Sequence, residues 1–234
     1  MKLSNMTIDV IKNFSTINTN LVLSEGSNVI KTMNLGKNVF AMATVPDEFP
    51  VQAVFNDVTK FLSVYKAFEE PEVEFDRNSV DVSTSDGKSV VRMLYADIRN
   101  IVYPEKDLKL PSEDLSFDLE EEDFKKLLRF CDILSLPNIR IRLNDDNQEE
   151  LLVESYNAEV KNSTDTYSVN IKDGYLLTNE NTSFVISLDR EHMKMIPGNY
   201  KITVSFAGVA KFENKDVDVT YFVALNRNNS KLGK

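Results

Sequence analysis

The sequence predicts an α+β protein made of two similar halves, and three observations lead to this prediction. Strand-like segments outnumber helix-like segments and follow one another over short turns, which is typical of antiparallel pairing. Four segments have the apolar period of amphipathic helices. A stretch with two prolines and mixed charge, 104–116, divides the 234 residues into parts of similar size.

The four predicted helices are 4–17, 56–68, 120–134 and 189–195. Ser4 and Asn56 are suitable N-caps for the first two. In the third, Phe124, Leu127 and Cys131 recur on one face, and four acids occupy the first turn, where the helix dipole stabilises negative charge. The fourth is short and ends before a Pro-Gly pair, which stops a helix.

The remaining apolar segments predict strands. They are 21–23, 29–33, 39–43, 50–54, 73–75, 80–83 and 89–95 in the first half, and 138–143, 149–156, 166–172, 182–188, 200–206 and 217–225 in the second. The segment 138–143 (NIRIRL) alternates apolar and polar residues, as a strand with one buried face does. An acidic turn, 144–147, follows it and predicts a hairpin with the next strand.

The two halves share one order of elements, which indicates an internal repeat. Each half begins with a helix, continues through strands to a strand that leads into a second helix, and ends with about three strands. A shift of 116 residues aligns the apolar positions of the two opening helices: Leu3, Ile8, Ile11, Phe14 and Ile17 with Leu119, Phe124, Leu127, Phe130 and Ile133. We therefore predict an N-terminal domain at 1–103, a connector at 104–116 and a C-terminal domain at 117–234.

The charge of the chain is strongly acidic, with a net charge of −10 and a pI of about 4.8. Averaged over the molecule, this argues against a nucleic-acid partner, because phosphate contacts need Lys and Arg. The predicted helices nevertheless carry cations away from their apolar stripes: Lys12, Lys60, Lys66, Lys125, Lys126, Arg129, Arg190 and Lys194. From these residues alone, an ordinary solvated face with weak salt bridges is the simpler interpretation.

Signatures of catalysis are missing from the sequence. With one histidine, His192, and one cysteine, Cys131, predicted to be buried, there is little basis for a catalytic triad or a zinc site. None of the seven glycines forms a nucleotide-binding loop, and no pair among the 37 acids stands out as a hydrolase pair. We therefore predict a protein that is not an enzyme and needs no cofactor or metal. We also expect no membrane span, no signal peptide and a reducing cytoplasm.

Five segments carry a resemblance to a known family. They are MKLS with IKNFSTIN at 11–18, FKKLLR at 124–129, MKMIPGNYK at 193–201, AKFE at 210–213 and YFVAL at 221–225. In order and spacing these resemble the DNA polymerase sliding clamps of T4-type bacteriophages. The total length and the position of the connector agree with that family, whereas 24–113 contributes only the order of its elements.

The resemblance implies a DNA clamp fold and a function. Three subunits would close into a ring, with antiparallel sheets outside and four amphipathic helices from each subunit lining the hole. The eight cations would then face the phosphates of double-stranded DNA. The implied function is tethering of the replicative DNA polymerase, as a processivity factor. The further partners would be an ATP-driven clamp loader and late-transcription factors, in the cytoplasm of an infected bacterial host.

The resemblance also implies two contact sites. In the ring, 89–103 of one subunit would pair with 157–172 of the next. A groove for partner peptides would use the connector as its wall and the last strand as its floor: Leu108, Leu110 and Pro111, with Tyr221, Val223 and Leu225. The alternative for the last three residues is that they belong to the core.

A β-rich phage structural or assembly protein is the alternative function. It would account for the strands and the acidity, but not for repeated amphipathic helices with cationic outer faces. DNA-dependent stimulation of a polymerase separates the two functions. A hydrolase with paired carboxylates is a third possibility, for which the sequence offers no substrate.

Overall fold

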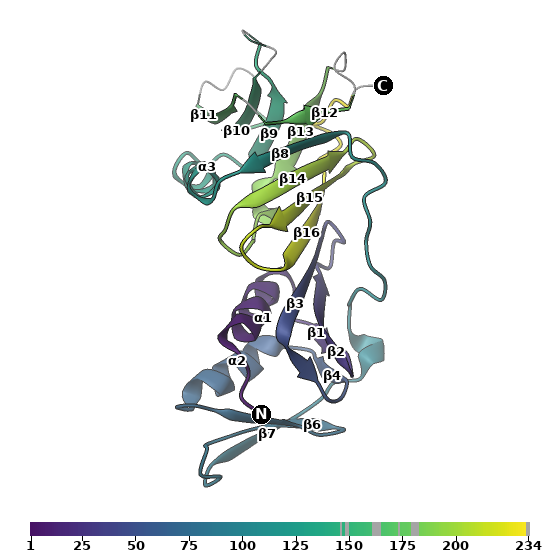
Figure 1. The fold of residues 1–234 in the computed structure, drawn as a ribbon, viewed down its shortest axis with the longest axis vertical. Helices are drawn as coiled ribbons and strands as arrows, with labels where there is room; N and C mark the ends of the chain where they lie inside the picture. Colours follow the sequence, from purple (N-terminus) through teal and green to yellow (C-terminus); the bar gives the residue numbers. More distant parts are fainter. Residues whose placement is uncertain (146, 148–149, 161–164, 173, 179–182, 233–234) are drawn as a thin grey trace. The chain divides into compact units, whose positions relative to one another are not determined.

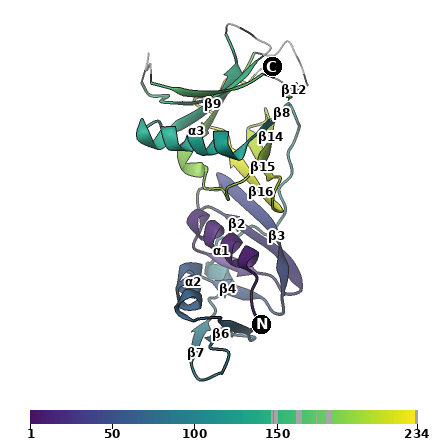
Figure 2. The same cartoon turned by 60° about the vertical axis from the view of Figure 1, so that its left-hand side comes forward.

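The computed structural model describes residues 1–145, 147, 150–160, 165–172, 174–178 and 183–232 (Figures 1 and 2). Its contacts divide the chain into two compact units, Met1–Asp107 (unit 1) and Leu108–Lys234 (unit 2). Each unit combines helices with antiparallel sheets, so the predicted α+β class is confirmed. Parts of the predicted strands and turns at 144–147, 149–156 and 182–188 lie outside the described residues.

Unit 1 contains two helices and two sheets. Its elements are α1 (Asn5–Ile17), β1 (Leu21–Leu23), β2 (Ser27–Met33), β3 (Val39–Phe49), β4 (Ala53–Phe55), α2 (Val58–Ala67), β5 (Glu72–Phe75), β6 (Ser79–Ser83), β7 (Val90–Leu94) and the 3-10 turn η1 (Ile98–Asn100). The first four strands pair in the order β3-β2-β1-β4, and the others in the order β5-β6-β7. Helix α1 packs on β2 and β3 and contacts α2.

Unit 2 contains one α-helix and two groups of paired strands. Its elements are β8 (Leu115–Leu119), α3 (Glu121–Ile133), β9 (Asn138–Leu143), β10 (Leu151–Tyr156), β11 (Tyr167–Ile171), β12 (Leu176–Leu177), β13 (Val185–Asp189), the 3-10 turn η2 (Arg190–His192), β14 (Tyr200–Ser205), β15 (Val209–Asn214) and β16 (Val219–Ala224). The pairing orders are β11-β10-β9-β13 and β12-β8-β14-β15-β16. Helix α3 packs on β10 and β11.

The predicted repeat is confirmed by strand order. The sheet β3-β2-β1-β4 with α1 corresponds to β11-β10-β9-β13 with α3, and β5-β6-β7 corresponds to β14-β15-β16. Ile11 and Leu127, which the shift of 116 residues aligns, are both fully buried under their helices. The boundary between the units falls inside the predicted connector 104–116, whose last two residues, Leu115 and Ser116, belong to β8.

Three predicted helices form within two residues of their predicted ends, because their caps and apolar stripes are local. Ser4 caps α1: its Oγ accepts a hydrogen bond from the Thr7 amide at 3.1 Å. Helix α2 is capped by Asp57 rather than by the predicted Asn56, and Asp57 Oδ1 accepts from the Thr59 amide at 3.1 Å.

The predicted fourth helix, 189–195, is wrong, because only the 3-10 turn η2 forms there. The amide of Met193 donates to the Arg190 carbonyl at 3.1 Å and completes this turn. The amide of Ile196 instead donates to the Tyr221 hydroxyl at 3.0 Å, and Pro197 has no amide to donate. The described part of the chain therefore contains three α-helices, not the four that the resemblance implied.

The core of each unit lies between its helices and its sheets. Phe14, Phe49 and Phe61 are buried in unit 1. In unit 2, Phe124 of α3 meets Tyr200 edge to face, with ring centroids 5.6 Å apart. Within the described residues, no helix has the length and apolar character needed to cross a membrane.

Candidate DNA-facing and partner-binding surfaces

Most of the predicted cations reach the surface, and all but Lys194 and Arg190 lie on α-helices. Exposed side chains belong to Lys12, Lys60, Lys66, Lys125, Lys126, Arg129 and Lys194. Arg190 differs, because its side chain is only 25% exposed and it forms a 3.0 Å ion pair with Asp132. Lys12 lies on the face of α1 opposite the buried Ile11 and Phe14, where the helical period places it.

The charge is not shared evenly among the helices. Helix α2 carries Lys60 and Lys66 and no acid, which gives it a charge of +2. Helix α3 carries four acids (Glu121, Glu122, Asp123, Asp132) and three cations (Lys125, Lys126, Arg129), so 3 − 4 gives it a charge of −1. The three exposed cations of α3 therefore share their helix with four acids, three of them in its first turn.

Two of the lysines on α3 are already paired. Lys125 forms an i,i+4 ion pair with Glu121, and Lys126 forms one with Glu122 at 2.7 Å. The hydrogen bond with Glu122 raises the pKa of Lys126. In the part of the chain that the structure describes, Lys12 and Lys66 form no ion pair. Arg129 is exposed and has no ion pair among those residues either, so Lys12, Lys66 and Arg129 are the predicted cations most available to an external phosphate.

The predicted floor of the partner groove is wrong. Tyr221, Val223 and Leu225 are buried in the core of unit 2, with exposed fractions of at most 5%. Tyr221 and Val223 lie on β16 and Leu225 follows it directly, and the ring of Tyr221 lies 6.4 Å from that of Tyr200 on β14. The residues predicted to form the wall of the groove are less buried than those of the floor: Leu108 and Pro111 are exposed and Leu110 is half-buried.

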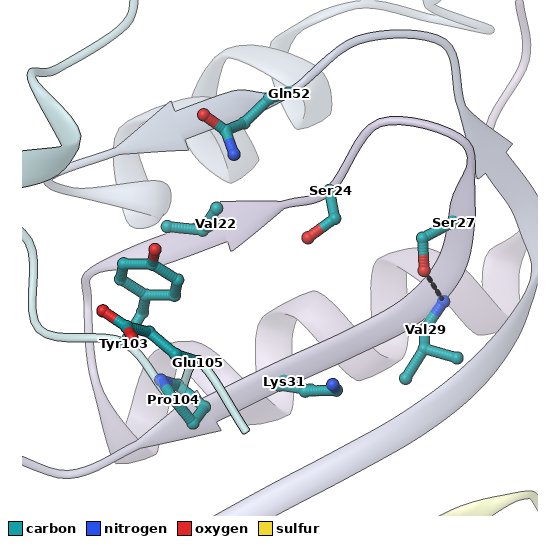
Figure 3. A pocket seen from close by; sticks show the side chains of 9 residues that line it. All are labelled: Val22, Ser24, Ser27, Val29, Lys31, Gln52, Tyr103, Pro104 and Glu105. Atoms are coloured by element: carbon teal, nitrogen blue, oxygen red, sulfur yellow. Dashed lines mark hydrogen bonds between the residues drawn. The ribbon is translucent and has the colours of Figure 1, made fainter. Parts of the chain in front are cut away.

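A pocket of about 370 Å³ lies in unit 1, between β1, β2 and the segment after η1 (Figure 3). Its lining consists of Val22, Ser24, Ser27, Val29, Lys31, Gln52, Tyr103, Pro104 and Glu105. The segment over it is held by a 2.6 Å ion pair between Lys31 and Asp107 and by a 3.1 Å hydrogen bond from Asn18 Nδ2 to the Val102 carbonyl. We call it the Tyr103 pocket. Sequence reasoning missed it because its walls are far apart in the chain.

Several edge strands are covered by other parts of the chain. The amide of Val73 on β5 donates to the Met1 carbonyl at 2.8 Å. Val185 on β13 exchanges two 2.7 Å hydrogen bonds with Lys231. The carbonyl of Val54 on β4 accepts from the Ala96 amide at 2.9 Å. Each of these edges is therefore closed to a further strand, at least in part.

The described residues add no covering segment to the edge strand β7 in unit 1 or to the edge strand β11 in unit 2. The two-residue β12 is another edge strand of unit 2. Strand β7 is apolar yet exposed along most of its length, and Leu94 has an exposed fraction of 79%. Exposed apolar edge strands invite pairing with another chain. These strands fall within the segments 89–103 and 157–172 that the family resemblance implies for subunit contact, although 161–164 lies outside the described residues.

Comparison with known proteins decides the family. The chain is 32% identical over 231 residues to the sliding clamp of Escherichia phage RB69, and the match covers 96% of each chain. The chain belongs to the sliding-clamp family of T4-type phages. It is also 28% identical to the sliding clamp of Enterobacteria phage T4 over 232 residues, with 96% of each chain covered. Residues 116–227 of this clamp match the family described as "gp45 sliding clamp, C terminal".

Solved structures show the same fold. The clamp resembles proliferating cellular nuclear antigen from Entamoeba histolytica with a TM-score of 0.63 and 13% identity, over 94% of each chain. It resembles the Helicobacter pylori beta clamp bound to a DNA ligase peptide with a TM-score of 0.64 and 14% identity, over 96% of this chain and 65% of that one. The predicted clamp fold is confirmed. Family membership argues against the two alternative functions, a phage structural protein and a hydrolase, because sliding clamps are non-enzymatic replication factors.

The cysteine of the clamp is buried, as the sequence predicts, and the histidine lies in the 3-10 turn η2. His192 is nearly buried in η2, with Asp189 and Glu191 at 3.9 and 3.6 Å. Cys131 is buried under α3, and burial raises the pKa of its thiol to about 11, so the thiolate is scarce at neutral pH. No cluster of three metal-binding side chains occurs within the described ranges.

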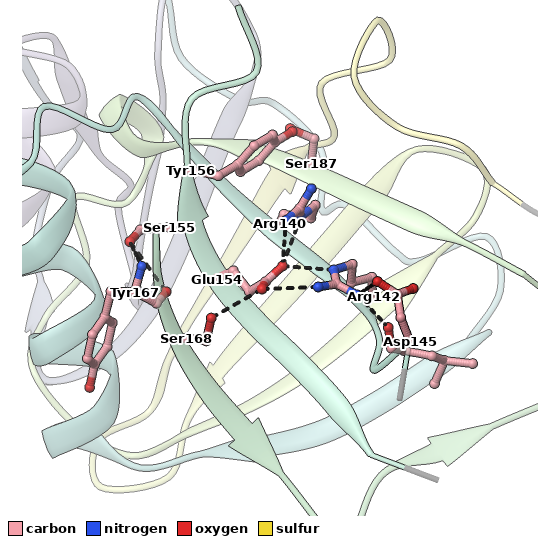
Figure 4. Close-up of polar contacts among 10 residues, drawn as sticks. Arg140, Arg142, Asp145, Glu154, Ser155, Tyr156, Tyr167, Ser168 and Ser187 are labelled. Atoms are coloured by element: carbon pink, nitrogen blue, oxygen red, sulfur yellow. Dashed lines mark hydrogen bonds and ion pairs between the residues drawn. The ribbon is translucent and has the colours of Figure 1, made fainter. Parts of the chain in front are cut away.

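The sheet β11-β10-β9-β13 contains a buried ionic cluster that the sequence analysis did not predict (Figure 4). Glu154 on β10 is 4% exposed. It accepts hydrogen bonds from Arg140 Nε and Arg142 Nε on β9, both at 2.9 Å, and from Ser168 Oγ on β11 at 3.1 Å. The guanidinium of Arg140 also lies 4.7 Å from the ring centre of Tyr156. The alternating arginines of NIRIRL were the available signal.

Proposed function

We propose that this clamp encircles double-stranded DNA as a closed homotrimer and tethers the replicative DNA polymerase to its template. A closed ring cannot leave a long duplex sideways, so processivity would come from topology rather than from tight binding. Contacts from Lys and Arg to phosphates carry no sequence information and allow sliding. The tethered polymerase then stays near its template at high effective concentration.

The observation that carries this proposal is the pair of uncovered edges. One edge, β7, lies in unit 1, and the other, β11, lies in unit 2. Two different edges produce a head-to-tail contact, and such contacts generate a closed ring when the rotation between subunits is right. We propose that β7 of one subunit pairs with β11 of the next, three times around the ring.

The inner surface in this proposal is formed by α1, α2 and α3. The unpaired lysines Lys12 and Lys66 would contribute most to phosphate contact, together with Lys60, Arg129 and Lys194. The paired Lys125 and Lys126 and the ion-paired Arg190 would contribute less. The acidic remainder of the chain would discourage DNA from binding elsewhere.

Partner proteins would exchange on the outside of the ring. We propose the DNA polymerase, an ATP-driven clamp loader and late-transcription factors as partners, in the infected bacterial cell. The related Helicobacter pylori clamp has been solved with a DNA ligase peptide. For this clamp we propose two peptide contacts: the Tyr103 pocket and, separately, the exposed connector residues Leu108 and Pro111 beside Leu110.

Light scattering tests the assembly. We expect a particle of three times the 26.6 kDa subunit mass at micromolar concentration. A stable monomer or dimer would contradict the ring. The connector contact is tested by changing Leu108 and Leu110 to Ser. We expect loss of polymerase stimulation with an intact trimer, whereas unchanged binding of the polymerase would leave the Tyr103 pocket as the remaining site.

A further inference from the structure

The outer edge of β13 is covered by a short polar segment, residues 226–231, which we call the strap. The backbone of Lys231 exchanges two 2.7 Å hydrogen bonds with the backbone of Val185, as in an antiparallel pair of strands. Leu225, directly before the strap, is the last buried apolar residue in the described part of the chain. The strap itself carries no apolar side chain. Hydrogen bonds therefore supply most of what holds it on β13.

The strap covers this edge without forming a regular strand. A regular antiparallel strand in the register of the Lys231 pair would place Asn229 opposite Ser187 and exchange two backbone hydrogen bonds with it. Instead, the Ser187 amide donates to Ser230 Oγ at 2.9 Å, and the Ser187 carbonyl accepts from the Asn226 amide at 2.8 Å. The amide of Asn229 turns back to the Asn226 carbonyl at 3.2 Å. A fully extended segment would therefore pair with β13 more regularly than the strap does.

The contacts of the strap favour local opening. Besides its bonds to the backbone of β13, Asn226 Nδ2 donates to Asp189 Oδ1 at 2.8 Å. Each of these hydrogen bonds contributes little net stability, because water offers the same partners when the strap leaves. Segments that bury few apolar groups open at a lower free energy than the core does. We therefore expect the strap to detach while the rest of unit 2 stays folded.

A pocket of about 480 Å³ lies beside the strap, and we call it the strap pocket. The strap contributes two amide side chains to its lining, those of Asn226 and Asn229. The charged residues of the lining are four acids and one cation: Asp132, Glu159, Asp189, Glu191 and Arg190. Hence 1 − 4 gives the lining a charge of −3, and Arg190 is already paired with Asp132 at 3.0 Å. The strap thus borders an acidic pocket to which it brings no cation.

We propose that the strap occupies a binding site for an extended, basic segment of a partner protein, and that this segment displaces it. The partner segment adds to β13 as a strand, which is a common mode of peptide recognition at a sheet edge. A Lys or Arg side chain at the place of Asn229 then enters the strap pocket, where its hydrogen bonds to carboxylates are stronger than those of an amide.

The site is separate from the other contacts of the clamp. Strands β13 and β11 are opposite edges of one sheet, so binding at β13 leaves the proposed subunit contact at β11 free. None of the residues that line the strap pocket belongs to the connector or to the Tyr103 pocket. While it is in place, the strap acts as an autoinhibitory contact, because it satisfies the edge that the partner segment needs.

The first test uses a fluorescent peptide with the strap sequence NRNNSKL (226–232) as the probe. A clamp variant that ends at Leu225 should bind this peptide. The parent clamp should bind it at least about tenfold more weakly, because its own strap competes at high effective concentration. Circular dichroism and light scattering confirm the fold and the assembly of the variant. No binding by the folded variant would contradict the proposal. Particles larger than the parent assembly, formed when variant and parent are mixed, would identify a second copy as the occupant and would also contradict it.

The basic character of the partner segment is tested by changing the probe. On the truncated clamp, the peptide with Asn229→Lys should bind at least about tenfold more tightly than the peptide with Asn229→Glu. Replacing Glu159 and Glu191 of the clamp by Gln should remove most of this difference. The matched control replaces Glu25 and Glu48, two exposed acids of unit 1, by Gln and should leave the difference unchanged. Equal affinity of the two peptides would show that the pocket does not select a cation.

A second variant locates the site without a deletion. Val185→Cys with Lys231→Cys places two cysteines at a hydrogen-bonded antiparallel pair, where Cα atoms lie about 5.5 Å apart, within reach of a disulfide. Cys131 does not interfere, because it is buried and the pKa of its thiol is raised to about 11. The reduced form should bind the peptide with Asn229→Lys, and oxidation should weaken this binding at least about tenfold by locking the strap in place. Equal binding in the two states would place the peptide elsewhere and overturn the inference.

Discussion

Glu154 shows at the residue scale how one side chain can order a sheet. Its buried carboxylate joins β9, β10 and β11 through Arg140, Arg142 and Ser168. The same sheet carries the β11 edge that we propose for subunit contact. A substitution at Glu154 is therefore expected to affect both the stability of unit 2 and the assembly of the ring.

Replacing Glu154 by Gln should destabilise the clamp by about 3 kcal/mol, because two partly buried guanidinium groups lose their counter-charge. Urea denaturation monitored by circular dichroism measures the change. Asp145→Asn is the control, because Asp145 also pairs with Arg142 but its side chain is 87% exposed. The control should cost less than about 0.5 kcal/mol. Equal stability of Glu154→Gln and the parent protein would show that the ionic cluster does not stabilise the fold.

The same carboxylate predicts a dependence on pH. Burial by itself would raise the pKa of Glu154, but the hydrogen bond and the charges of Arg142 and Arg140 outweigh burial and leave this pKa lowered. A pKa lowered by folding adds stability above the ordinary glutamate value of about 4.3, and this stability is lost as the pH falls through the lowered value. The parent protein should therefore lose more stability than Glu154→Gln between about pH 5 and pH 3. Parallel acid curves would contradict the assignment.

Tyr221 shows a property that the residue pattern of a strand could not predict, namely whether its side chain is buried. The alternating sequence predicts that Tyr221, Val223 and Leu225 point the same way, and all three are buried. It does not say which face meets solvent, because that depends on what packs against the strand. Here the ring of Tyr200 meets that of Tyr221, and all three residues belong to the core instead of to a groove floor.

At the scale of elements, the sequence predicted α1, α2 and α3 well because their signals are local. The fourth helix failed for a non-local reason: the hydroxyl of Tyr221, 25 residues from Ile196, takes the amide that would have extended it. Strand β3 runs to Phe49, beyond the predicted end at Ala43, and it includes Pro46. The register between β2 and β3 shifts beside this point, so no ladder hydrogen bond from Pro46 is needed.

The uneven charge of the helices predicts unequal effects of neutralising their lysines. Changing Lys12 and Lys66 to Gln should weaken DNA binding and flatten its salt dependence, because fewer counterions leave the DNA when fewer cations bind its phosphates. Changing Lys125 and Lys126 to Gln should have a smaller effect, because Glu121 and Glu122 already balance them. Titration of labelled duplex at several salt concentrations measures both. A larger effect of the α3 pair would contradict the proposed inner surface.

At the scale of the whole molecule, the repeat was predictable and the free edges were not. The alignment of Ile11 with Leu127 follows from a fixed period in the sequence. The availability of an edge depends instead on cover from distant segments, such as Met1 over β5 and Lys231 over β13. Only the structure shows that β7 and β11 are left uncovered by the residues it describes.

The central claim is that the clamp holds DNA by topology. Its most direct test is retention of the clamp on a nicked circular duplex. The clamp is loaded with the proposed ATP-driven loader, and the complex is passed through a gel-filtration column in high salt. The account predicts that the clamp elutes with the circle and is released after a single cut makes the DNA linear. Salt-sensitive binding that persists equally on circular and linear DNA would show attachment by affinity and contradict the account.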